Sequence, residues 1–87
     1  YKQIKEVISV ASTLISQRQF DDAIIEAKRA LNINNSDPEA HFVLGIAFAK
    51  KSMLSEAYEE FKLASAFAPK NSEIEHRAME MMAKINI

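Results

Sequence analysis

A pattern of small and apolar residues between Pro38 and Pro69 constrains the fold more than any other part of the chain. The pattern consists of two sets of residues. The first set has the spacing of one helical face and comprises His41, Leu44, Gly45 and Phe48. The second set has the same spacing and comprises Ala57, Phe61 and Ala64. Because Gly45 and Ala57 leave room for two helix axes to approach, the pattern predicts packed antiparallel helices over 38–51 and 56–68.

The same pattern recurs in the first half of the chain after a shift of roughly 34 residues. Small residues fall on small ones and apolar residues on apolar ones: Val10 on Leu44, Ala11 on Gly45, Leu14 on Phe48, Ala23 on Ala57 and Ala30 on Ala64. Two positions differ, since Phe61 falls on Ala27 and Pro69 on Asn35. The shift predicts helices over 3–17 and 22–33, a turn at 18–20 and a loop at 34–36.

The same shift in the forward direction predicts a fifth helix over 72–86. It places Ala78, Met79 and Met82 at the positions of Leu44, Gly45 and Phe48. Charged residues alternate with apolar ones here, as expected of an amphipathic helix that covers the last core face of a repeat array.

Residues that favour helix ends support these boundaries. Asp21, Asp37 and Ser55 are predicted N-caps, because their side-chain oxygens can accept from the free N–H groups of a first turn. Pro38 suits the first helical position, and Pro69 is predicted to end the preceding helix.

The central segment resembles the tetratricopeptide repeat, whose pattern is W-x2-L-G-x2-Y, followed by A-x3-F and then P. The matching residues are Leu44, Gly45, Ala57, Phe61 and Pro69, with His41 in place of the Trp and Phe48 in place of the Tyr. The resemblance implies an all-α, right-handed solenoid of antiparallel helix pairs within one domain, 1–87. It implies repeats at about 4–37 and 38–71, then a capping helix at about 72–87. It also implies a non-catalytic scaffold that binds a protein or peptide.

Composition argues against several other classes of function. The formal net charge is −1, so electrostatics favours neither a nucleic acid nor an anionic membrane as partner. The chain has no Cys and therefore no thiolate chemistry, and a single Gly does not form a phosphate-binding loop. We expect no enzyme activity and no cofactor.

The two histidines are the only residues that invite a metal or catalytic interpretation. Glu73 and His76 have the spacing of one half of a carboxylate-bridged metal site, but such a site needs a second copy. The sequence holds one copy, which favours a solvated pair on a helix face. His41 stands at an aromatic position of the repeat, so we expect a packed, partly buried imidazole and not a catalytic base.

Some tetratricopeptide proteins bind the C-terminal carboxylates of heat-shock chaperones through Lys, Asn and Arg side chains. The resemblance carries those positions to Ile8, Ser12, Val43, Glu73 and Arg77 of this chain. Only Arg77 matches, and Glu73 has the wrong charge for a carboxylate ligand. We therefore expect no binding of chaperone tails.

A second apolar strip makes the helix over 38–51 apolar on nearly all sides, which predicts that something covers it. In tetratricopeptide proteins the equivalent strips line a concave groove. The predicted partner-binding residues are Ile8, Ser12, Ile15, Phe42, Val43, Ile46, Ala49, His76, Arg77 and Glu80. We expect an amphipathic helix or apolar peptide there, and the alternative is a fragment of a longer array or a module that self-associates into a homo-oligomer.

Overall fold

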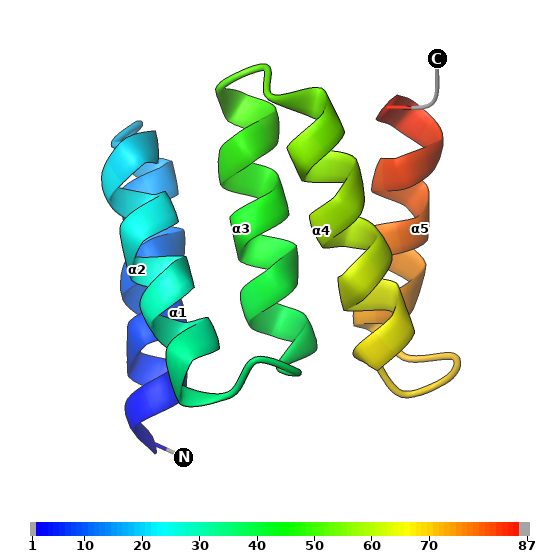
Figure 1. Cartoon of the computed structure of the whole chain (residues 1–87), viewed down its shortest axis with the longest axis horizontal. Helices are drawn as coiled ribbons and strands as arrows, with labels where there is room; N and C mark the ends of the chain where they lie inside the picture. Colours follow the sequence, from blue (N-terminus) through cyan, green and yellow to red (C-terminus); the bar gives the residue numbers. More distant parts are fainter. Residues whose placement is uncertain (1, 86–87) are drawn as a thin grey trace.

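The computed structural model describes residues 2–85, which form five α-helices joined by short loops (Figure 1). The helices are α1 (Lys2–Ser16), α2 (Phe20–Ile33), α3 (Pro38–Lys50), α4 (Leu54–Phe67) and α5 (Glu73–Ile85). No strand occurs in this range, so the predicted all-α class is confirmed. The fifth helix was predicted to reach residue 86, which lies outside the described residues together with residues 1 and 87.

Each helix packs mainly against the next helix along the chain. Figure 1 shows α1 behind α2 and α5 behind α4, with α3 between the two pairs. Helix α3 also touches α1 and α5, whereas α2 and α4 do not meet. The odd-numbered helices therefore lie on one side of the molecule, with α3 in contact with both α1 and α5.

The first two helix pairs repeat their backbone geometry at a spacing of 34 residues. Helices α2 and α4 each have 14 residues and start at Phe20 and Leu54. The preceding turns contain Arg18 and Ser52, both in the left-handed region with φ of 64° and 63°. The predicted period is thus reproduced in the backbone as well as in the residue types.

Helix α5 departs from this period by one residue. Ser72 Oγ accepts from the N–H of Glu75, as Asp37 Oδ1 accepts from the N–H of Ala40, and these pairs are 35 residues apart. The loop before α5, 68–72, is one residue longer than the loop before α3, 34–37, and contains Asn71 with a φ of 65°.

This offset corrects the predicted alignment of the fifth helix. Ala78 corresponds to Val43 rather than to Leu44, and the positions of Leu44 and Gly45 are taken by Met79 and Glu80. Met82 likewise does not stand at the position of Phe48. A fixed period fails here because loop length is not encoded in the apolar spacing of the helices.

The helix caps are confirmed at one of the three predicted positions. Asp37 caps α3 through Oδ1, 3.0 Å from the Ala40 nitrogen, with Pro38 in the first turn. Helices α2 and α4 begin earlier than predicted, and Asp21 and Ser55 lie inside them. Their N-cap positions are Gln19 and Met53, which make no side-chain capping bond. The left-handed turn residue brings the chain into helical geometry before the predicted cap.

Gly45 permits the close approach of α3 and α4. A Cβ atom at this position would lie 2.7 Å from Cε1 of Phe61, far inside van der Waals contact. Phe61 is fully buried, so its ring has little room to move away. In the first pair the corresponding residues are Ala11 and Ala27, both fully buried, which explains how a small residue replaces the phenyl ring there.

Candidate functional site

The predicted partner-binding residues fall into three classes of exposure. Ile8, Phe42 and Val43 are buried, and Ile15, Ile46 and Ala49 are half-buried. The four polar residues are exposed: Ser12, His76, Arg77 and Glu80. Their role in binding stays a prediction, but the apolar surface open to a partner is narrower than the sequence indicated.

The buried part of the strip is covered by the chain's own helices. The ring of Phe42 packs 5.5 Å from the ring of Phe61 on α4, measured between centroids. On its other side the guanidinium carbon of Arg77 lies 5.0 Å from the Phe42 centroid, within reach of a cation–π interaction. Helix α5 thereby covers part of the apolar strip, which the sequence analysis expected a ligand or another chain to cover.

Because α5 is offset by one residue, the α5 residues that correspond to the predicted partner-binding strip of α3 differ from those predicted. With the observed offset, Arg77 corresponds to Phe42 and Lys84 to Ala49. His76 and Glu80 correspond to His41 and Gly45, the face that α3 turns toward α4. Both are exposed, because no further described helix packs against α5 there.

A hollow of about 430 Å³ opens where the α1–α2 turn meets the end of α3. Its lining comprises Ile15, Ser16, Arg18, Phe20 and Lys50. Two cations and two apolar residues line it without an acidic residue, so it would suit an acidic segment with an aliphatic side chain. Sequence analysis did not single out Arg18, Phe20 or Lys50, because they are brought together only by the packing of α3 beside the turn.

A second hollow of about 480 Å³ lies at the opposite end of the first helix pair. It is lined by Ile4, Lys5, Ile33, Asn34, Asp37 and Glu39. Both charge signs are present, and Asp37 is already engaged as the cap of α3. This hollow shows no preference for a particular ligand chemistry.

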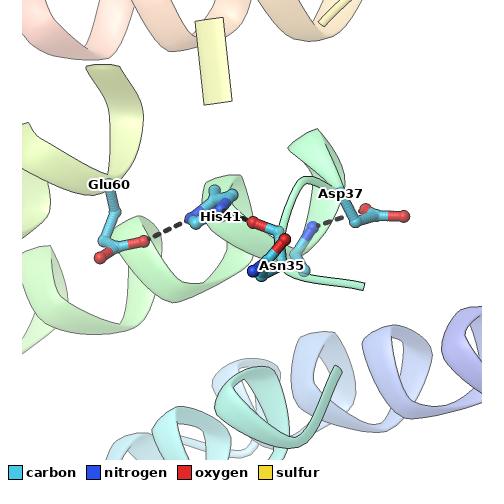
Figure 2. A network of polar contacts seen from close by, with 5 residues as sticks. Asn35, Asp37, His41 and Glu60 are labelled. Atoms are coloured by element: carbon cyan, nitrogen blue, oxygen red, sulfur yellow. Dashed lines mark hydrogen bonds and ion pairs between the residues drawn. The ribbon is translucent and has the colours of Figure 1, made fainter. Parts of the chain in front are cut away.

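His41 is the buried polar residue of the core and is held by two contacts (Figure 2). Its Nδ1 lies 2.7 Å from Glu60 Oε1 on α4, and its Nε2 lies 2.8 Å from the carbonyl oxygen of Asn35 in the α2–α3 loop. The ring also lies 5.5 Å from the ring of Phe67. The structure thus confirms a packed imidazole.

Other site classes receive no support from the described residues. Glu73 and His76 are both exposed, and residues 2–85 contain no cluster of three or more side chains able to hold a metal ion. None of the helices in that range has the length and apolar character needed to cross a membrane.

Comparison with known proteins does not place this chain in a family. No family model matches its sequence, and no curated protein matches it either.

Proposed function

We propose that this chain is a tetratricopeptide-like helical repeat that binds a segment of another protein on the side formed by α1, α3 and α5. The observation that carries the proposal is a set of half-buried apolar residues on α1 and α3, namely Ile15, Ile46 and Ala49. The backbone repetition at 34 residues and the contacts of α3 with α1 and α5 support the same conclusion. The role is one of binding, without catalysis.

The chemistry of this surface indicates an apolar segment with acidic residues. Exposed cations border this apolar set, and they are Arg18, Lys50, Arg77 and Lys84. The Arg77 guanidinium is already positioned over an aromatic ring, which lowers the entropy that a carboxylate contact would cost. Burying one large aliphatic side chain contributes about 1.5–3 kcal/mol, so a few such anchors would bring affinity into the micromolar range.

The proposal can be tested with peptides selected from a random library on the 87-residue chain. We expect selected peptides to combine aliphatic with Asp or Glu residues, and Ile46→Glu to weaken their binding at least about tenfold in calorimetry. Arg77→Ala should weaken binding less, with a smaller dependence on salt than the wild-type chain shows. Circular dichroism checks that each variant stays helical.

Matched controls lie on the helices of the opposite layer. Ile25→Glu on α2 and Lys62→Ala on α4 alter exposed residues of the same types and should leave affinity unchanged. Because Ile46 is half-buried, Ser12→Glu provides an exposed substitution on the binding side that does not threaten the core. Binding that survives both Ile46→Glu and Ser12→Glu but is lost in Ile25→Glu would overturn the proposal.

A second candidate is association between copies of the chain, favoured by the exposed apolar residues outside the strip. These include Val10, Ile25, Ile33, Phe67 and Met79, each more than 40% exposed. Sedimentation velocity over a hundredfold concentration range separates the two candidates. A dimer that is lost in Met79→Glu and retained in Ile46→Glu would favour self-association through α5.

A further inference from the structure

The imidazole of His41 lies between two hydrogen-bond acceptors. Glu60 offers a carboxylate oxygen to Nδ1, and Asn35 offers its backbone carbonyl oxygen to Nε2 (Figure 2). Neither an ionised carboxylate nor a carbonyl group carries a hydrogen to donate. Both hydrogens must therefore come from the ring.

A neutral imidazole has one N–H group and would satisfy only one of these acceptors. The side chain of His41 is 8% exposed, so water cannot readily replace a missing partner. We propose that folding holds His41 as the imidazolium. Its two N–H groups then join α3 to α4, through Glu60, and to the loop before α3, through Asn35. Loss of the proton would leave a nitrogen lone pair facing the Glu60 carboxylate and would loosen the α3–α4 pair.

The charged groups around the ring favour this arrangement on balance. Helix α4 contributes Glu60, whose side chain is 19% exposed, and Phe67, whose ring is uncharged. The loop contributes Asp37, whose carboxylate accepts from the Ala40 N–H one turn before the ring. Among residues 2–85, Glu60 forms no ion pair with a lysine or arginine that would compete with His41.

Two further groups bear on the charge of the ring. The N-terminal end of α3 opposes a positive charge at His41, but such a dipole effect is smaller than two charge-assisted hydrogen bonds in a buried site. Helix α5 packs on α4, and its Arg77 lies over the Phe42 ring and forms no ion pair with Glu60. The acceptors therefore decide the protonation state.

The direction of the pH effect follows from the proton count. A histidine in an unfolded chain loses its proton at about pH 6.5, whereas the proposed arrangement needs a hydrogen on each ring nitrogen of folded His41. Since the proposed folded state binds one more proton at this site, the contribution of the site to stability falls as pH rises above about 6.5, as long as Glu60 is ionised. The unfolding equilibrium constant should increase by at most about tenfold per pH unit, until the folded ring also loses its proton.

Urea denaturation between pH 5.5 and 9 tests this inference on the full chain. Wild type should show an unfolding constant at pH 8.5 at least about tenfold above its value at pH 6. Glu60→Gln should lose most of this dependence, because the amide N–H donates to Nδ1 of a neutral ring while Nε2–H still donates to Asn35. His76→Gln, which changes the exposed histidine at the corresponding position of α5, should retain the wild-type dependence.

Nitrogen chemical shifts of the two imidazole rings give a second measurement that needs no variant. At pH 7.5 we expect both ring nitrogens of His41 to carry hydrogen, with the exposed His76 ring as the reference signal in the same spectrum. Equal pH dependence in wild type and Glu60→Gln would overturn the inference. A single protonated nitrogen on His41 at pH 7.5 would overturn it as well, even if Glu60→Gln failed to fold.

Discussion

Gly45 carries a cost in helix propensity that the packing of α3 on α4 offsets. Glycine within a helix is about 1 kcal/mol less favourable than alanine. The position nevertheless admits no Cβ atom, because the Phe61 ring occupies the space. This requirement was visible in the sequence, since the only glycine of the chain stood at a fixed distance from a phenylalanine on the next predicted helix.

Gly45→Ala is therefore expected to destabilise the chain, although alanine is the better helix former. Overpacking a filled core costs about 1–3 kcal/mol, which exceeds the propensity gain over most of that range. Urea denaturation measures the change, and the exposed Ala66→Gly gives the propensity difference at a site without packing. Combining Gly45→Ala with Phe61→Leu should recover part of the loss, and a stabilised Gly45→Ala single variant would contradict this account.

The burial of individual strip residues was harder to predict than their apolar character. Phe42 and Val43 were expected to form an open groove floor, and both are buried. The cover of Phe42 comes in part from Arg77, a residue 35 positions away on α5. Helical periodicity identifies which face a residue lies on, but it does not state how much of that face a distant helix covers.

Among the helices, the ends were less predictable than the centres. All five predicted helices are present. Where the described range includes their bounds, these agree with the prediction or differ from it by at most two residues. The predicted starts of α2 and α4 were both two residues late for the same reason. A residue of a capping type, Asp21 or Ser55, lay near each start, but each helix begins one residue before it. Left-handed residues at Arg18 and Ser52 give no sequence signal, since neither is glycine.

The caps yield a direct comparison between two aspartates. Asp37→Ala should lower stability by about 1 kcal/mol, because it removes the acceptor for the Ala40 N–H at the start of α3. Asp21→Ala should cost less, since Asp21 lies inside α2 and only pairs with Lys51 on the exposed surface. Thermal denaturation measures both, with Asp37→Asn as a control that keeps a capping oxygen. A larger loss of stability in Asp21→Ala than in Asp37→Ala would indicate that Asp21 caps α2 after all.

At the scale of the whole molecule, α5 completes the core while leaving part of its own surface open. Ala78 is fully buried, and Met81, Met82 and Ile85 are packed against the core cluster. The opposite face of the helix is exposed at His76, Met79, Glu80 and Ala83. The prediction of a covering helix was correct in kind, but its register depended on a loop length that residue patterns did not reveal.

Ala78→Asp should therefore be far more damaging than Ala83→Asp on the same helix. A charge without a partner at a buried site costs about 3 kcal/mol or more, whereas the same charge at the exposed site costs little beyond helix propensity. Urea denaturation followed by circular dichroism measures both. Similar stability of the two variants would show that α5 does not dock as described. A separate early loss of helix in Ala78→Asp would show that α5 unfolds independently.

The additional residue between α4 and α5 has a consequence for any helix that comes to lie along the open face of α5. One residue rotates a helix by about 100°, so this face presents Glu80 where α3 presents Gly45. A glutamate side chain keeps a neighbouring backbone at a greater distance than a glycine does. A helix docking here would have to lie farther from α5 than α4 lies from α3, and it would meet a carboxylate. The contact that joins the two helices of a pair in this chain therefore cannot be reproduced on α5.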